Sequence, residues 1–163
     1  MWKRRKVLKA AGLGMMAGLA PRVVLASDTL PEGVHSSDLI YLTPIKSNGE
    51  ESSCQSEIWF VTDGTDLFVC TGTESWRAQA PRKGLTRTRI WVGDLGNWRG
   101  TDGKYKRLPQ LEATAGIVDD KAQQDEILDL FGDKYPVSWV VYGPRFRSGL
   151  EDGSRTMIRY RPA

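Results

Sequence analysis

The chain has 163 residues with 23 basic and 20 acidic side chains, which gives a formal net charge of +3 at pH 7. Six basic residues and no acidic residue lie in residues 1–26, so residues 27–163 carry 17 basic and 20 acidic side chains. This larger part lacks the excess positive charge that nucleic-acid binding needs, so we exclude a nucleic-acid partner. Its length suits one domain around a single core.

Residues 1–26 have the layout of an export signal. A basic head precedes a short apolar run, Ala10 to Ala20, which is far below the roughly 20 residues of a permanent membrane anchor. The string Arg4-Arg5-Lys6-Val7-Leu8-Lys9 resembles the twin-arginine consensus. Arg22 is also typical of that class, because a basic residue before the cleavage site disfavours general secretion.

We therefore predict cleavage after Ala26, where small residues occupy the positions that a signal peptidase reads. Residues 27–163 would then reach the periplasm, with the twin-arginine translocation machinery as a partner. Two alternatives are a basic amphipathic helix on a membrane surface and an uncleaved signal that acts as an anchor. The apolar residues form one block instead of a helical stripe, which argues against the amphipathic helix.

Short strands are predicted after the signal. Residues 27–37 are rich in turn formers and predict a loose lead-in, and the alternation from Leu39 to Ile45 predicts a first strand. Residues 58–62 and 66–70 are apolar runs joined by Asp63-Gly64-Thr65, which predicts a hairpin with a short glycine loop.

Two cysteines, Cys54 and Cys70, would meet an oxidising compartment, where a disulfide is conceivable. Folding back around Gly64 places Cys70 opposite about Ile58, four residues along the ladder from Cys54. That offset is roughly 13 Å at about 3.3 Å per residue, beyond the roughly 7 Å Cα limit for a disulfide. We predict two unpaired thiols.

The next segment predicts two strands separated by a long loop. Residues 88–92 and 111–118 have strand character, and residues 93–106 contain four glycines and no regular period.

A helix and two closing strands follow. Asp119-Asp120 offers an N-cap, and Ile127, Leu128 and Phe131 have helical spacing up to Gly132, which predicts the helix end. The closing strands are predicted at residues 137–142 and 156–160. Many short strands with one late helix predict an antiparallel barrel with a helical appendage. No GxGxxG or P-loop string indicates a dinucleotide or nucleotide fold.

The order of these motifs resembles the split β-barrel flavoproteins related to pyridoxamine 5′-phosphate oxidase. The similarity spans roughly residues 39–161, and it implies a mainly β protein, an antiparallel split β-barrel with one or two short helices. The matching pieces are Tyr41-Leu42-Thr43, Asn48-Gly49, Ile58-Trp59-Phe60-Val61, Asp63-Gly64-Thr65, Leu67-Phe68-Val69, Thr71, Ser75-Trp76-Arg77 and the helix end Phe131-Gly132-Asp133-Lys134-Tyr135.

In that family a Thr–Ser–Lys stretch holds the phosphate of FMN. The resemblance assigns Thr71 and Ser75 to this stretch, and Arg77 replaces the lysine. A guanidinium can fork onto phosphate oxygens, and hydroxyls can donate to them. The other residues that we place near the cofactor are Lys83, Arg87, Arg89, Trp59 and Trp76.

Two departures from the family pattern leave the identity of the ligand undecided. No arginine stands at positions 55–57, and Arg87-Thr88 occupies the place of the usual Asn-Pro. FMN is the implied cofactor, while a deazaflavin, another ligand or an empty site are the alternatives.

Purely structural roles compete with each assignment. The segment from Thr71 to Ser75 is also typical of a turn or helix cap, the basic residues suit a solvated surface, and the tryptophans suit a core. His35 is the only histidine and lies in the turn-rich lead-in, so we expect neither a metal site nor a catalytic triad. No side chain stands out as a general acid or base, so catalytic residues stay unassigned.

The resemblance implies an exported FMN-binding protein, an oxidoreductase acting on a small-molecule substrate, and a homodimer with the ligand between subunits. The flavin would supply the chemistry. One alternative is a non-catalytic periplasmic binding or assembly factor on the same barrel, with the site blocked by bulky or acidic side chains around Glu57 and Glu74. The other is a carrier for an apolar ligand, built as a closed up-and-down meander.

Overall fold

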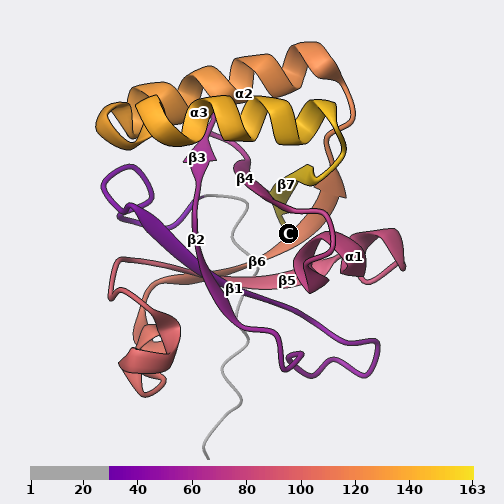
Figure 1. Ribbon diagram of the computed structural model, residues 1–163. Coiled ribbons are helices and arrows are strands. Elements are labelled where there is room, and N and C mark those ends of the chain that lie inside the picture. The colour runs from indigo at the N-terminus through magenta and orange to yellow at the C-terminus, as the bar shows by residue number, and fades with distance from the viewer. Residues whose placement is uncertain (1–29) are drawn as a thin grey trace, which may run out of the picture.

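The computed structural model describes residues 30–163, so the twin-arginine string and the predicted cleavage site lie outside the described residues. Seven antiparallel strands form one sheet in the order β2-β1-β5-β6-β7-β4-β3, which curls into a nearly closed barrel (Figure 1). The strands are β1 (Leu39–Pro44), β2 (Ser56–Trp59), β3 (Val61–Thr62), β4 (Leu67–Gly72), β5 (Arg87–Val92), β6 (Gln110–Ile117) and β7 (Arg155–Pro162). The predicted mainly β, antiparallel split barrel is confirmed. Because the order is not sequential, the barrel is not the meander expected of an apolar carrier.

The split in the barrel arises where the predicted strand 58–62 is interrupted at Phe60. The residues before it form β2, which pairs with β1, and those after it form β3, which pairs with β4. The predicted hairpin is present, but it holds only the pairs Val61↔Phe68 and Thr62↔Leu67. Phe60 leaves the ladder because its backbone N–H and carbonyl bond to the hydroxyl of Tyr135 instead. The two edge strands are thus consecutive in the chain.

The barrel interior is filled by side chains from alternate positions of its strands. In β4, Leu67 and Val69 point into the barrel, while Phe68 and Cys70 point outward, as the two-residue period of a strand requires. The lead-in is turn-rich as predicted, but it is not loose throughout, because Val34 is buried in this core. The buried interior comprises Val34, Ile40, Leu42, Phe60, Leu67, Val69, Ala78, Ile90, Val92, Leu111, Ala113, Ala115, Ile158 and Tyr160.

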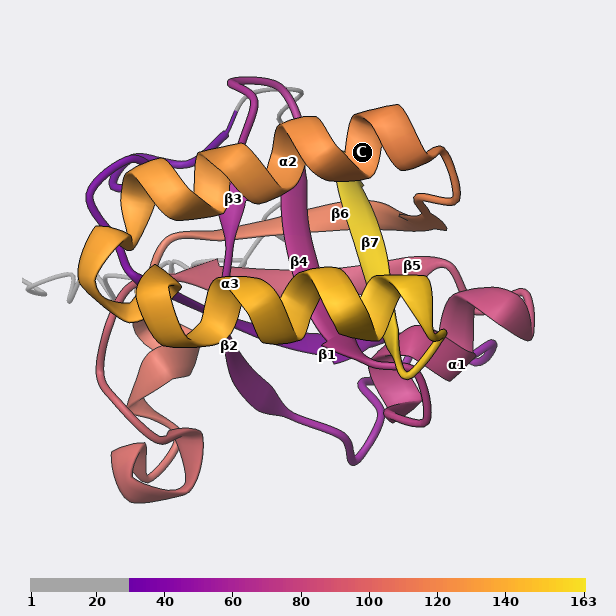
Figure 2. The same ribbon diagram turned by 45° about the horizontal axis from the view of Figure 1, so that its top comes forward.

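Three helices accompany the barrel: α1 (Trp76–Arg82), α2 (Lys121–Lys134) and α3 (Pro136–Glu151). Helices α2 and α3 lie side by side over the outward faces of β3, β4 and β7 (Figure 2). They cover an outer core that contains Phe68, Phe131 and Phe146. Within residues 30–163, no helix combines the length and apolar character needed to cross a membrane.

Two predictions about this helical layer were wrong. Asp120 caps α2 as expected, accepting from the Gln123 N–H at 2.7 Å, but Gly132 does not end the helix, which continues to Lys134. A Cβ at Gly132 would lie 3.0 Å from the Trp139 ring, so the glycine allows α3 to pack closely. Residues 137–142 are not a strand but part of α3, which begins at Pro136, a residue suited to a first helical turn.

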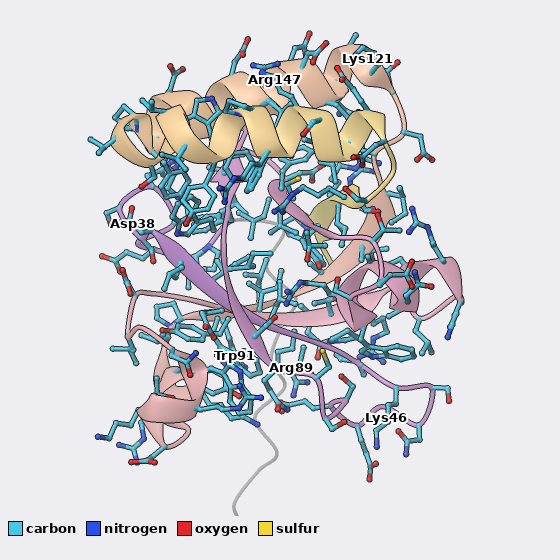
Figure 3. All side chains as sticks on the ribbon, in the orientation of Figure 1. Asp38, Lys46, Arg89, Trp91, Lys121 and Arg147 are labelled. Atoms are coloured by element: carbon cyan, nitrogen blue, oxygen red, sulfur yellow. The ribbon has the colours of Figure 1, made fainter. Side chains whose placement is uncertain are left out.

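The predicted loop 93–106 is folded onto the barrel through two short 3-10 helices, η1 (Trp98–Thr101) and η2 (Lys104–Arg107). Tyr105 of η2 stacks on Tyr41 at 4.9 Å and meets Trp91 edge-on at 5.3 Å. Figure 3 places Trp91 and Arg89 on the side of the barrel away from α2 and α3. The loop therefore covers the side of the barrel away from the helical layer.

Candidate functional site

A polar cluster occupies the split between β2 and β4. Arg77, in the first turn of α1, donates from Nε to the Thr71 hydroxyl at 2.7 Å and from a terminal nitrogen to the Ser56 hydroxyl. The Thr71 and Ser75 hydroxyls lie 3.2 Å apart. The structure thus brings together the predicted residues Thr71, Ser75 and Arg77, and it adds Ser56. We call these four residues the arginine–hydroxyl cluster.

Local structure explains how the cluster forms. Thr71 is near the end of β4, Ser75 is the N-cap residue of α1, and Arg77 follows in the helix, so a short chain segment turns back on itself. The Ser75 hydroxyl makes no capping bond, which leaves it free to face Thr71. Ser56 comes from β2, a strand that is not paired with β4. Arg77 therefore bridges the two sides of the split.

The charge of Arg77 has no counterion in the described part of the chain. Its guanidinium is partly buried and bonds to hydroxyl groups, and none of the ion pairs within residues 30–163 includes it. Burial raises the pKa of the Tyr160 hydroxyl, and the nearby positive charge of Arg77 opposes that rise. A partly desolvated cation surrounded by hydroxyl groups favours an anionic ligand.

A pocket of about 320 Å³ lies along the same split, on the side facing α3. Ile58 lies two residues after Ser56 in β2, and Cys70 precedes Thr71 in β4, so the pocket and the arginine–hydroxyl cluster are built from the same two strands. Cys70 lies on the outward face of β4, and Thr71 lies on the opposite face. The wall is mostly apolar and aromatic, with one cation. The lining residues are Ile58, Trp59, Cys70, Tyr142, Phe146 and Arg155.

Trp59, a predicted ring-flanking residue, is both a packing and a pocket residue. Its ring stacks on Tyr135 at 4.9 Å with an interplanar angle of 11°, and Tyr142 meets it edge-on at 5.2 Å. It is only partly buried and lines the pocket. Trp59 therefore presents an aromatic surface that is held in place by two tyrosines.

Both cysteines are free, which confirms the predicted unpaired thiols. The two cysteines are kept apart by a different feature from the expected long hairpin. Cys54 precedes β2, which pairs with β1, whereas Cys70 lies in β4, which pairs with β7. Burial raises the pKa of the Cys70 thiol to about 11, although the charge of Arg155 opposes the rise. Cys70 is therefore a protonated wall residue of the pocket at neutral pH.

The remaining predicted basic residues do not join the cluster. Lys83 lies at the exposed end of α1, where its ammonium sits 5.2 Å from the centre of the Trp76 ring. Arg87 and Arg89 bond instead to Glu112, at 2.9 Å and 2.7 Å. These residues already have counterions or solvent around them, in contrast to Arg77.

The acidic side chains that would mark a blocked site are directed elsewhere or exposed. Glu57 accepts from the Asn97 amide at 2.9 Å and from the Trp98 N–H at 3.1 Å, so it anchors η1. Glu74 is exposed. Neither carboxylate bonds to Arg77 in the described residues.

Several residues at the split escaped sequence reasoning. From the sequence, Ser56 stood out only as a position that lacks the arginine of the family pattern. Its place in the cluster depends on the hydrogen bond that it accepts from Arg77 across the split. Lys134 and Tyr135 belong to a quoted motif, yet their target is the strand break: Lys134 donates to the Phe60 carbonyl at 3.0 Å. Burial lowers the pKa of Lys134 to about 8, while the charge of Asp38 opposes this. Asp38 lies between the barrel and the helical layer in Figure 3.

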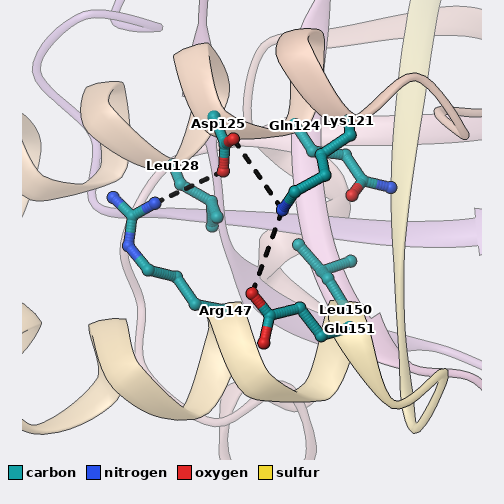
Figure 4. A pocket seen from close by; sticks show the side chains of 7 residues that line it. All are labelled: Lys121, Gln124, Asp125, Leu128, Arg147, Leu150 and Glu151. Atoms are coloured by element: carbon teal, nitrogen blue, oxygen red, sulfur yellow. Dashed lines mark hydrogen bonds and ion pairs between the residues drawn. The ribbon is translucent and has the colours of Figure 1, made fainter.

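A second pocket, of about 430 Å³, lies between α2 and α3 and is a poorer candidate (Figure 4). Its two cations are already paired: Arg147 contacts Asp125 at 3.4 Å, and Lys121 lies 3.9 Å from both Asp125 and Glu151. These exposed pairs join the helices. Among residues 30–163, no group of three or more side chains could hold a metal ion.

No family model and no curated protein matches the sequence. Solved structures do match the fold. The heme storage protein HutZ from Vibrio cholerae is 14% identical, with a TM-score of 0.56 over 81% of this chain and 86% of the other. A putative pyridoxamine 5′-phosphate oxidase from Listeria innocua is 14% identical, with a TM-score of 0.51 over 79% and 86%. A conserved hypothetical protein from Mycobacterium tuberculosis is 18% identical, with a TM-score of 0.56 over 83% of each chain.

The chain is a split barrel. Its architecture is similar to that of the pyridoxamine 5′-phosphate oxidase-like proteins, as the motif order predicted. Sequence identities this low indicate a shared fold but not a shared ligand. The features that bear on the ligand are the arginine–hydroxyl cluster and the adjacent pocket.

Proposed function

We propose that the protein binds FMN, or a closely related flavin phosphate, at the split of its barrel. The observation that carries this proposal is Arg77, a partly buried guanidinium that bonds to hydroxyl groups and to no carboxylate of the described chain. A phosphate would supply the missing negative charge. The neighbouring pocket offers an aromatic wall for a planar ring.

Each part of the site fits one part of such a ligand. Arg77, Thr71 and Ser75 would hold the phosphate through charge-assisted hydrogen bonds, and Trp59 would contact the ring system. When bound, the flavin would supply electron transfer to or from a small substrate, which would make the protein an FMN-dependent oxidoreductase. The chain itself would supply binding, orientation and a counter-charge.

The phosphate dependence of binding tests the proposal. Charge-assisted hydrogen bonds contribute about 1.5–3 kcal/mol each, and about 1.4 kcal/mol is a tenfold change in affinity. We expect Arg77→Ala to weaken FMN binding by roughly one to two orders of magnitude in a fluorescence-quenching titration. Arg77→Lys should retain much of the affinity, because the charge remains.

Two controls separate the site from general charge effects. Arg87→Ala removes an exposed arginine that is paired with Glu112, and it should leave FMN binding unchanged. Riboflavin lacks the phosphate, so it should bind weakly and respond little to Arg77→Ala. If the unmutated protein shows no binding at FMN concentrations of about tens of micromolar, the cofactor proposal is wrong. Unchanged binding in Arg77→Ala would remove only the assignment of the residues.

A second candidate is a non-catalytic periplasmic binding or assembly factor on the same barrel. The observation that favours it is that Arg77 already donates hydrogen bonds to the hydroxyls of Thr71 and Ser56. With these donors occupied, the cluster could hold the two sides of the split together without a ligand. Hemin belongs in the same titration, because HutZ is described as a heme storage protein. Hemin binding without FMN binding would favour this candidate.

Export and pairing complete the proposal. We propose delivery of residues 27–163 to the periplasm by the twin-arginine machinery, which transports folded proteins and so suits a cofactor inserted before transport. We also propose that the protein acts as a homodimer, since the family that it resembles commonly pairs.

A further inference from the structure

The 320 Å³ pocket beside α3 holds a cation for which the described chain supplies no counterion. Arg155, the first residue of β7, is the only charged residue among the lining side chains. It is half-buried, and no ion pair within residues 30–163 includes it. The acids nearest in sequence, Glu151 and Asp152, are exposed, and Glu151 lies 3.9 Å from Lys121. The counter-charge of this pocket is therefore left for a ligand to supply.

Packing against α3 holds the Arg155 side chain in place. Its stem lies where Gly149 leaves room, because a Cβ at Gly149 would come within 2.7 Å of the Cγ and Cδ atoms of Arg155. The guanidinium carbon lies 4.6 Å from the centre of the Phe146 ring. A guanidinium that rests its face on a ring keeps its N–H donors in its own plane, where they can reach another group. Arg155 is therefore a positioned donor at one end of the pocket.

The rest of the pocket wall is apolar and aromatic. From Arg155 on β7, the wall continues over Cys70 on β4 to Trp59 on β2, with Phe146 and Tyr142 contributed by α3. Trp59 forms the end away from Arg155 and meets the Tyr142 ring at 5.2 Å. The volume of about 320 Å³ is at the lower end of the roughly 300–1,000 Å³ of ligand pockets. The pocket therefore suits a small ligand with one anionic group and one apolar ring.

We infer that this pocket binds a small aromatic carboxylate, with its carboxylate on Arg155 and its ring against Trp59 and Tyr142. A planar carboxylate matches the fork of a guanidinium through two parallel hydrogen bonds. Its single negative charge balances the single cation of the wall. A phosphate monoester carries close to two negative charges, and the lining residues include no second cation for it. Charge and shape together favour the carboxylate.

Arg155 and Arg77 have separate tasks in this arrangement. Arg77 bonds to Thr71, whereas Arg155 lies beside Cys70, and Thr71 and Cys70 are on opposite faces of β4. The two arginines therefore suit two different anionic groups. Binding of the carboxylate depends only on the pocket. Its role as the substrate rests on the proposed function, in which the flavin ring contacts Trp59 and the substrate ring would lie next to it.

Isothermal titration calorimetry with phenylacetate, on protein free of FMN, tests the inference. We expect Arg155→Gln to weaken phenylacetate binding about ten- to a hundredfold, because charge-assisted hydrogen bonds are lost. Arg155→Lys keeps the charge and the stem beside Gly149, so it should retain part of the affinity. Arg161→Gln is the matched control. Arg161 points to the same face of β7 but is exposed and lies 3.6 Å from Asp66, outside the pocket, so this variant should bind phenylacetate normally.

Two further measurements locate the bound carboxylate. 2-Phenylethanol has the same ring with a neutral hydroxyl in place of the carboxylate, so it should bind much more weakly than phenylacetate and should not respond to Arg155→Gln. Bound phenylacetate should also slow the alkylation of Cys70, which lines the pocket, as followed by mass spectrometry. Cys54 is half-buried and outside the pocket, and its alkylation rate should not change. Circular dichroism should show that each variant is folded.

The outcomes for the carboxylate and for FMN are separate. Absence of phenylacetate binding at about 1 mM, a free energy of binding weaker than about −4 kcal/mol, would overturn the inference. Equal affinity of the unmutated protein and Arg155→Gln would overturn it too, and so would equal affinity for 2-phenylethanol. Phenylacetate binding that depends on Arg155 supports the inference. If that binding is found and FMN does not bind, the carboxylate site stands and only the flavin proposal is wrong.

Discussion

The hydroxyl of Tyr135 links three chain segments at the strand break. It accepts from the Phe60 N–H at 3.2 Å and lies 2.8 Å from the carbonyl oxygens of Phe60 and Asp38, which share its single proton as acceptors. Burial raises the pKa of this hydroxyl well above its usual value, so it remains protonated and able to donate. One residue of the helical layer thus fixes the point where the barrel opens.

Tyr135→Phe should destabilise the fold while keeping its packing. The ring would remain stacked on Trp59, but the Phe60 N–H, buried with its residue, would lose its partner. An unsatisfied buried donor costs about 1–3 kcal/mol, and we expect a loss of that order in urea unfolding followed by circular dichroism. Tyr142→Phe, at a partly exposed ring, is the matched control and should change the unfolding free energy little. Equal stability of the two variants would contradict this role for Tyr135.

At the scale of single residues, the order of motifs predicted part of the cluster. Thr71, Ser75 and Arg77 lie within seven residues of one another, so a turn after the strand suffices to bring them together. Ser56 joins them from a distant strand, and no local pattern could have indicated this. Lys83 was close in sequence but is directed into solvent at the end of α1. Proximity in sequence predicted the contacts that a single turn makes and no others.

At the scale of elements, the assignment of residues 137–142 as a strand failed for an identifiable reason. Their β-branched and aromatic residues have high strand propensity, and the apolar run suggested burial. In the structure, Pro136 starts a helix and the valines face outward. The signal that favoured a helix was Pro136, which suits a first helical turn. Gly143 and Gly149 disfavour a helix by themselves, but they lie on its buried side, where the lack of a side chain allows close packing.

Gly143 tests this packing. A Cβ there would lie 2.9 Å from the Trp139 ring, whose position is fixed by stacking on Phe131 at 5.8 Å. Alanine normally stabilises a helix by about 1 kcal/mol relative to glycine, but overpacking costs about 1–3 kcal/mol. We therefore expect Gly143→Ala to lower the unfolding free energy, with a disturbed tryptophan fluorescence. Gly116→Ala, where a Cβ meets open space, should be tolerated.

The strands carry their own electrostatic element, a chain of ion pairs on the face away from the helices. Glu112 contacts Arg87 and Arg89, and Glu51 contacts Arg89 and Lys106, at 2.6–3.0 Å. Hydrogen bonds from Arg87 and Arg89 hold the pKa of Glu112 below its usual value. Burial tends to raise the pKa of Glu51, but its bonds to Lys106 and Arg89 outweigh burial, so its pKa is also lowered.

These shifts predict an acid-sensitive contribution to stability. A carboxylate whose pKa is lowered by folding stabilises the folded protein at a pH above the pKa that the group has in the unfolded chain, about 4.3 for glutamate. This stabilisation is lost as the pH falls through the lower pKa of the folded state. Solvent screening limits each contribution to roughly 1 kcal/mol or less. The free energy of unfolding, measured with urea, should fall as the pH is lowered from 7 to 3. We expect this fall to be smaller in the double variant Glu51→Gln/Glu112→Gln. Glu126→Gln, at an exposed carboxylate outside the ion pairs of the described residues, should leave the decline unchanged.

At the scale of the whole molecule, charge divides the chain into two unlike parts. Residues 1–26 hold six basic side chains and no acidic one, and the remainder is mildly acidic. The barrel that follows builds its core from strands far apart in sequence, since β1 pairs with β5 and β4 with β7. Such a fold forms only once the whole chain is available. A transport route that accepts folded proteins therefore suits it.

The twin-arginine assignment makes a prediction for the complete precursor. Changing Arg4 and Arg5 together to lysine keeps the positive charge but removes the paired guanidinium groups, so the precursor should remain in the cytoplasm in its folded form. Lys3→Gln is the matched control: it lowers the charge of the head but keeps both arginines, and it should permit export. Cell fractionation would locate each variant, and mass spectrometry of the exported protein should find Ser27, or a residue next to it, at the mature N-terminus. Normal export of the double-lysine variant would contradict the twin-arginine route, and export only of unfolded protein would do the same, because that behaviour belongs to general secretion.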